Sequence, residues 1–141
     1  MLSGDYIAGL ADGEGCFYVN VYERDQAKYP AAKPQIKVHF YIKLREDDLD
    51  LLKKVRQSLG FGFIYFQKET RPNHSSCYRF EVNSLKDWEK LISFFEVHKL
   101  QSQKKFKDFL ICKEIYNIMI SGVHLTVGGA DEIRQLKSQM H

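Results

Sequence analysis

Cysteine is scarce in this chain of 141 residues, which contains only Cys16, Cys77 and Cys112. An odd number of cysteines at wide, unrelated spacings does not form a disulfide framework, and it does not match the ligand spacing of a zinc site. The pattern is typical of a protein that works inside the cell in a reducing compartment. A bacterial cytoplasm and an organelle, either chloroplast or mitochondrion, are equal alternatives at this point.

Long apolar runs and linker sequences are also lacking. No stretch of about 18 uncharged apolar residues occurs, which excludes a membrane span and predicts no membrane partner. The first 15 residues contain acids but no base, so they do not resemble a signal peptide. The chain has only three prolines, no internal repeat and no linker-like stretch. We therefore expect a single domain over residues 1–141.

The residues that are present favour a folded protein of mixed charge. A hydrophobic content of 44%, with 13% aromatic residues, is enough for a packed core and excludes a disordered chain. A net charge of +3 is too small to identify a binder of polyanions by itself. The charges are unevenly placed, because the acids Asp5, Asp12 and Glu14 precede basic strand-like and C-terminal segments.

The spacing of apolar residues predicts the order of secondary structure. Alternation predicts strands over 16–24, 35–44, 61–68 and 77–83. Helical spacing and capping residues predict helices over 3–13, 46–59, 102–120 and 130–140, and another that begins after Ser84. The order α-β-β-α-β-β-α, with extra C-terminal helices, predicts an α+β fold in which helices cover one face of an antiparallel sheet.

The sheet face that the helices leave open is expected to be polar and basic. Only three acids, Glu23, Glu69 and Glu81, are expected near this face to oppose its bases. A two-stranded ribbon fits the major groove of duplex DNA, where Arg and Lys suit guanine and Gln and Asn suit adenine. The candidate DNA-binding residues are Tyr18, Asn20, Tyr22, Arg24, Gln35, Lys37, His39, Tyr41, Lys43, Tyr65, Gln67 and Arg79. An ordinary solvated sheet face is the alternative interpretation.

The segment IAGLADGEG, residues 7–15, gives a more specific indication. Its order of apolar, small, glycine and acidic residues resembles the signature of the LAGLIDADG homing endonucleases. The predicted element order agrees with the fold of that family, so the resemblance covers most of the chain and implies a saddle-like sheet.

A calcium loop of the EF-hand type is excluded, because Cys16 occupies the fifth position, where that loop requires an oxygen ligand.

The motif also has a direct physical interpretation. Gly9 and Gly13 are four residues apart, so they lie on one helix face and allow a second helix to approach closely. Two-fold packing of such helices would bring two copies of Glu14 together. Carboxylates that close repel each other unless a cation lies between them, and oxygen ligands favour Mg²⁺. The expected dimer interface is formed by Asp5, Gly9, Asp12 and Gly13.

The resemblance implies roles for individual residues. Glu14 corresponds to the metal-binding acid of the family, Gly13 to the residue whose carbonyl assists it, and Asp12 to a structural acid. An assisting catalytic lysine corresponds to Lys104, with Lys105 as the alternate. Where some relatives carry a water-organising Gln, this chain has Leu44, with Lys43 as its polar neighbour.

The single copy of the motif sets the expected assembly and function. One Glu14 per chain implies a homodimer, and a symmetric reader prefers a near-palindromic DNA target of about 20 base pairs. We therefore expect a Mg²⁺-dependent, site-specific double-strand DNA endonuclease of the intron-homing type. The alternatives are a non-cleaving relative, either a DNA-binding regulator or a maturase whose partner is intron RNA, and a structural interaction module.

Overall fold

A computed structural model describes residues 1–22, 28 and 34–141 of the chain. The predicted end of the first strand and the loop after it lie outside these residues, and so does Arg24. In chain order the elements are α1 (Gly4–Glu14), β1 (Gly15–Tyr22), β2 (Gln35–Arg45), α2 (Leu49–Leu59), β3 (Phe63–Gln67), β4 (Cys77–Val82), α3 (Leu85–Val97), α4 (Gln103–Ser121) and α5 (Val127–Ser138), with 3₁₀ helices at Glu46–Asp48 and Val123–Leu125. The predicted α-β-β-α-β-β-α order is confirmed.

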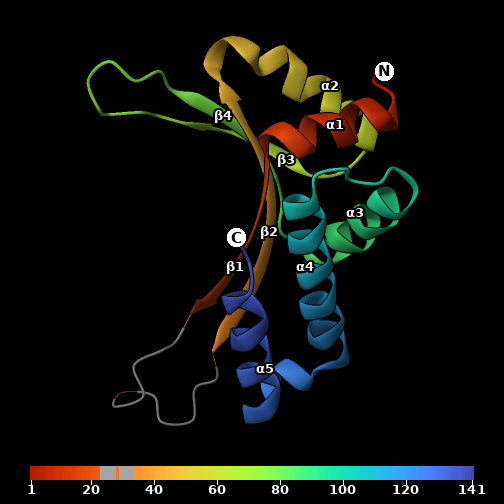
Figure 1. Cartoon of the computed structure of the whole chain (residues 1–141). Coiled ribbons are helices and arrows are strands. Elements are labelled where there is room, and N and C mark those ends of the chain that lie inside the picture. Colours follow the sequence, from red (N-terminus) through yellow and green to blue (C-terminus); the bar gives the residue numbers. More distant parts are fainter. Residues whose placement is uncertain (23–27, 29–33) are drawn as a thin grey trace.

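The four strands form one antiparallel sheet in the order β1-β2-β4-β3 (Figure 1). The β1–β2 register places Tyr18 opposite His39. Arg79 of β4 lies opposite Lys43 of β2 on one side and opposite Tyr65 of β3 on the other. The long strand β2 therefore joins the first hairpin to the second and curves along its length, as Figure 1 shows.

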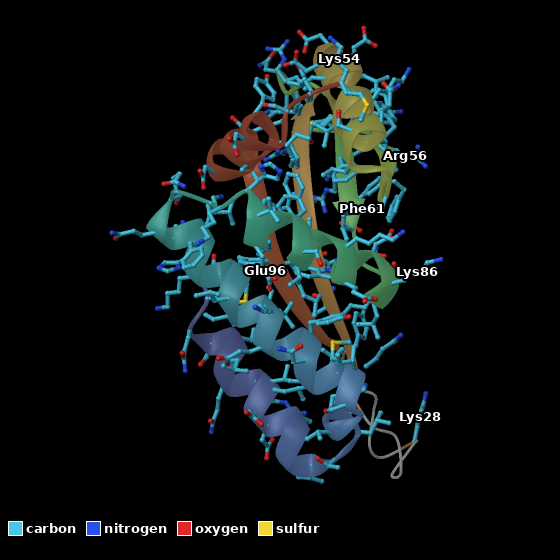
Figure 2. All side chains as sticks on the ribbon, turned by 90° about the vertical axis from the view of Figure 1, so that its right-hand side faces the viewer. Lys28, Lys54, Arg56, Phe61, Lys86 and Glu96 are labelled. Carbon is cyan, nitrogen blue, oxygen red and sulfur yellow. The ribbon has the colours of Figure 1, made fainter. Side chains whose placement is uncertain are left out.

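The helices cover one face of this sheet. Figure 2 views the molecule from that side, and α3, α4 and α5 lie in front of the strands. Beneath them is a core that includes Phe40, Phe80 and Trp88, all at most 1% exposed. The Trp88 indole donates a hydrogen bond to the Val38 carbonyl at 2.9 Å, which ties α3 to β2. The predicted α+β architecture with helices on one sheet face is thus confirmed.

Local chemistry explains where the helices begin and how they are joined. The Ser84 hydroxyl accepts a hydrogen bond from the Asp87 backbone N–H at 3.1 Å, so Ser84 is the N-cap that the sequence predicts. Glu96 of α3, labelled in Figure 2, forms an ion pair of 2.7 Å with Lys113 of α4. In the part of the chain that the structure describes, no helix is long and apolar enough to cross a membrane.

The last helix is where the sequence-based prediction is wrong. Helix α5 begins at Val127, not at residue 130, and so includes Gly128 and Gly129, which the predicted helix leaves out. The Thr126 hydroxyl accepts a hydrogen bond from the Gly129 N–H at 3.0 Å and so caps the helix early. An added Cβ on Gly129 would lie 1.9 Å from the Val123 carbonyl oxygen, so this glycine is required by packing and does not mark a turn.

The first helix also extends further than the sequence predicts. The sequence predicts a helix over 3–13 that Gly13 and Gly15 break, but α1 continues to Glu14. The break comes at Gly15, whose backbone N–H donates to the Ala11 carbonyl. A Cβ at Gly15 would lie 2.6 Å from that carbonyl oxygen, so only glycine allows the strand to leave the helix here. Glu14 is therefore the final residue of α1.

Candidate functional site

The C-terminal end of α1 has the electrostatic character of a cation site. Glu14 is exposed there, and the last turn of the helix carries no base. The helix macrodipole places partial negative charge at this same end, which makes a carboxylate unfavourable unless a positive charge lies nearby. The Glu14 carboxylate and the Gly13 backbone carbonyl offer oxygen ligands at this helix end, the type that Mg²⁺ prefers. The donor chemistry thus fits a divalent ion.

One chain alone does not complete such a site. Across residues 1–22, 28 and 34–141, no group of three or more His, Cys, Asp or Glu side chains is placed to hold a metal ion. Glu14 contributes one carboxylate from the end of one helix.

The glycines of α1 leave one face of the helix bare. Gly9 and Gly13 are exposed, and an added Cβ on either would meet no atom within 4 Å. Packing within the chain therefore does not require glycine at these two positions, in contrast to Gly15. A bare, exposed stripe with four-residue spacing is suited to close contact with another helix.

The other acids of α1 contact helices of the same chain. The Asp12 carboxylate accepts hydrogen bonds from the Gln101 N–H, at 3.0 and 3.1 Å, and from the Ser102 N–H at 3.0 Å. These amides precede α4, so Asp12 satisfies donors at the start of that helix. Asp5 lies 2.9 Å from Nδ1 of His98, at the end of α3. Both acids thus fix α1 against the helical layer.

A lysine of α4 reaches the end of α1. The Lys105 ammonium donates a hydrogen bond to the Gly15 carbonyl, immediately after Glu14. Lys104 lies on the exposed surface of the same helical turn. The sequence predicts Lys104 as the assisting lysine and Lys105 as its alternate, and of the two it is Lys105 that contacts the end of α1. Asp12 accepts a hydrogen bond at the start of α4 and so fixes this helix against α1. In this arrangement the Lys105 side chain is half-buried, whereas that of Lys104 is exposed.

The candidate DNA-binding residues that the structure describes share one sheet face. The register pairs them across strands, and alternate residues of a strand point to the same side. These residues are Tyr18, Asn20 and Tyr22 on β1; Gln35, Lys37, His39, Tyr41 and Lys43 on β2; Tyr65 and Gln67 on β3; and Arg79 on β4. Helices α3 and α4 lie on the other side of the sheet (Figure 1). We call this open surface the polar sheet face.

Not all of its members are accessible. The His39 side chain is only 8% exposed and its ring stacks on Tyr18, with 4.2 Å between centroids and 3° between planes. Both His39 ring nitrogens are buried without a hydrogen-bond partner in the described structure. Lys37 and Gln35 are exposed at the end of β2 that is distant from α1.

Burial also sets the charge of this face. It lowers the pKa of His39 against the opposing effect of Glu81, which favours a neutral imidazole near pH 7. A hydrogen bond with Cys16, followed by burial, raises the pKa of Tyr41 to about 12. Burial raises the pKa of Tyr18 and of Tyr65 as well. The tyrosines are therefore neutral hydrogen-bonding groups, and lysine and arginine carry the positive charge.

Sequence reasoning missed the burial of one acid. Glu81 was counted only as an acid near the bases, but it is buried in the middle of the polar sheet face. Its separation of two residues from Arg79 was the available signal, because that spacing places both on one face. At the end of β2, Leu44 packs against the core on the opposite face of the sheet. Its neighbour Lys43 therefore lies on the polar sheet face, as the alternation predicts.

Comparison with known proteins decides the family. The sequence model of the family described as LAGLIDADG endonuclease matches residues 7–116. The chain belongs to the LAGLIDADG endonuclease family. The match begins inside α1, at the motif of residues 7–15 that contains Glu14, and extends into α4, so it includes the polar sheet face and Lys105.

One relative is the probable intron-encoded endonuclease 3 of Neurospora crassa. It is 30% identical over 135 residues, which cover 95% of this chain and 24% of that protein. The chain spans about a quarter of the length of the relatives it matches.

Solved structures of the family share the fold. The crystal structure of the homing endonuclease I-TnaI has a TM-score of 0.82 at 31% identity, with coverage of 99% of this chain and 88% of that one. I-SmaMI bound to an uncleaved DNA target in the presence of calcium ions gives 0.83 at 26% identity. The match to I-SmaMI covers all of this chain but only 45% of that one, so this chain corresponds to about half of that LAGLIDADG enzyme.

Proposed function

We propose that this chain is a site-specific double-strand DNA endonuclease of the intron-homing type that acts as a homodimer with Mg²⁺. The observation that carries the proposal is the arrangement around α1. An exposed carboxylate, Glu14, ends a helix whose glycine face is bare, and β1, which carries the first residues of the polar sheet face, begins at the next residue. The DNA-bound structure of I-SmaMI, which is about twice as long, supports a DNA partner and two such units.

The metal would be held by Glu14 and the Gly13 carbonyl of each chain. A divalent cation bound there would lower the pKa of a water molecule and neutralise charge that develops on the phosphodiester. Glu14 supplies the negative charge that retains the ion, and the second copy supplies its partner carboxylate. The bare face of α1, with Gly9 and Gly13, lets the two helices come close enough to share the site.

The remaining residues position the DNA. Lys37 and Lys43 supply positive charge toward the duplex, and the neutral tyrosines supply hydrogen bonds. The Lys105 ammonium, fixed at the Gly15 carbonyl, stabilises negative charge near the end of α1. Cleavage of both strands follows from two-fold symmetry, since each chain contributes the same groups to one strand.

Metal removal tests the proposed reaction. A plasmid carrying the preferred target, recovered by selection from randomised duplexes, should be linearised in Mg²⁺ and remain intact in EDTA. Binding to the target should persist with calcium in place of magnesium. Agarose gels follow the cleavage and electrophoretic mobility shifts follow the binding. Linearisation in EDTA would contradict metal-assisted hydrolysis.

The two adjacent lysines of α4 provide a matched pair of variants. Lys105→Met is expected to reduce the single-turnover cleavage rate about 100-fold, because it removes a charged donor next to the site. Lys104→Met removes the same charge one residue away and should leave the rate within about threefold. Thermal unfolding of both variants shows whether the fold is retained. Equal losses, or a larger loss for Lys104→Met, would contradict the assignment of Lys105.

One observation favours a second function, that of a non-cleaving protein of this fold, either a DNA-binding regulator or a maturase that binds intron RNA. Leu44 faces the core where some relatives carry a water-organising glutamine, so no amide from that position reaches the polar sheet face. If this function is correct, the protein should retain target DNA or intron RNA in Mg²⁺ and produce no breaks. The plasmid experiment above distinguishes the two functions.

A further inference from the structure

Glu81 is a buried carboxylate within a surface that otherwise suits DNA. It is 5% exposed and lies on β4, one of the two inner strands of the sheet. Its Oε2 accepts a hydrogen bond from the Asn83 amide at 2.9 Å and lies 3.6 Å from Nδ1 of His39. Its Oε1 lies 3.5 Å from Nη1 of Arg79. A negative charge here opposes DNA binding in general, so its burial and its partners require a specific explanation.

Arg79 is held from three directions before DNA is present. The guanidinium lies over the Tyr41 ring, 3.8 Å from its centroid, and 5.8 Å from the centroid of Tyr65. Glu81 approaches one end of the guanidinium fork, and Nε of Arg79 is buried without a partner in the described structure. The side chain is only 15% exposed. An arginine that merely contacts phosphates does not need this degree of order, because a flexible point charge is sufficient there.

We propose that Glu81 is a positioning residue that orients Arg79 to read a guanine in each half of the DNA target. This inference rests on the proposed DNA-binding function. The planar fork of arginine matches O6 and N7 of guanine, which is the commonest specific contact in the major groove. Glu81 does not read a cytosine amino group itself, because its carboxylate is buried beneath Arg79 and His39.

The register also locates the guanine relative to the cut. Gly15, next to Glu14, lies opposite Ile42, and the following residue of β2, Lys43, lies opposite Arg79. Strand β1 leads away from this level to Tyr22, seven residues further, or about 23 Å. Arg79 therefore reads a base pair close to the scissile phosphates, and Tyr22 and Gln35 contact the outer part of each half-site.

Selection from a randomised duplex library, with calcium in place of magnesium, tests this inference. The wild-type protein should recover targets with guanine at one symmetric pair of positions near the centre. Arg79→Ala and Arg79→Lys should each reduce that preference about tenfold to a hundredfold, and the lysine variant should retain overall affinity. Glu81→Gln, which preserves shape, should weaken the preference at the same pair of positions and leave the others unchanged.

Two further variants separate positioning from general electrostatics. Glu69 lies outside the sheet and forms an ion pair with Arg71, with 2.8 Å between Oε2 and Nη2. Glu69→Gln breaks this pair and should leave the base preference at every position of the target unchanged. Asn83→Ala removes the amide that holds Glu81 without removing its charge, and should weaken the same guanine preference. In an Arg79→Ala background, Glu81→Gln should have no further effect on that position. Thermal unfolding identifies any variant that fails to fold, and Asn83→Ala then replaces Glu81→Gln in the comparison.

Three results would overturn the inference. Unchanged preferences in both Glu81→Gln and Asn83→Ala would exclude a positioning role. A loss at positions different from those of Arg79→Ala, or an equal loss for all sequences, would make Glu81 a general electrostatic element. Failure of the proposed function itself would be distinct, because the wild-type protein would then select no sequence at all.

Discussion

Replacing Glu14 with glutamine is expected to lower the rate of DNA cleavage at least about 1,000-fold while DNA binding stays within about threefold. A bound divalent cation contributes several kcal/mol to phosphodiester hydrolysis, and each 1.36 kcal/mol corresponds to a factor of ten in rate. Glutamine keeps the shape of the side chain but removes the charge that retains the ion. Single-turnover cleavage and mobility-shift titration on the same target measure the two quantities separately.

The control for this variant is Glu132→Gln. Glu132 is an exposed acid on α5, which is distant in sequence from the motif. Its replacement changes the net charge by the same amount as Glu14→Gln. It should leave cleavage and binding unchanged. Retained cleavage in Glu14→Gln would remove Glu14 from the reaction, and an equal loss of binding in both variants would show that the effect is one of net charge.

Gly9→Gln should eliminate dimer formation and reduce cleavage at least about 100-fold without unfolding the chain. An added side chain at Gly9 meets no atom of its own chain within 4 Å, and glutamine is a better helix former than glycine. The unfolding temperature should therefore stay the same or rise slightly. A polar side chain in the helix contact would separate the two Glu14 carboxylates, and small displacements of reacting groups are costly in rate. Size-exclusion chromatography with light scattering reports the assembly.

Gly128 provides the matched control. It is an exposed glycine within α5, and an added Cβ there also meets nothing within 4 Å. Gly128→Gln makes the same chemical change away from α1 and should preserve both assembly and cleavage. If Gly9→Gln remained dimeric and active, the bare face of α1 would not be the contact between chains.

The sequence predicts the sheet well, because the face that a strand residue occupies depends only on its neighbours along the same strand. Alternation has a period of two in a pleated strand, so residues such as Ile36 and Lys37 fall on opposite faces by geometry alone. The polar sheet face follows from the same rule, and the register confirms that its described members share one side. The end of α1 is predicted to within one residue, because a glycine lies on each side of Glu14 and Gly15 is the one that interrupts the helix.

The contacts that the sequence does not predict join residues distant along the chain. The Asp12 carboxylate caps the start of α4 about 90 residues later, and this cap decides which of two adjacent lysines reaches Gly15. The ion pairing of Glu81 depends on β2 and β4, which are not consecutive in the chain. Burial of these groups results from tertiary packing, and an alternating pattern reports only which side a residue faces.

The mass of the complex with one target duplex tests the central claim most directly, namely that two α1 helices meet and share a metal site through Glu14. Native mass spectrometry in calcium should give two 16.5 kDa chains per duplex, and the same stoichiometry should hold at every protein excess. A stable complex of one chain per duplex that cleaves both strands when magnesium is added would contradict the claim.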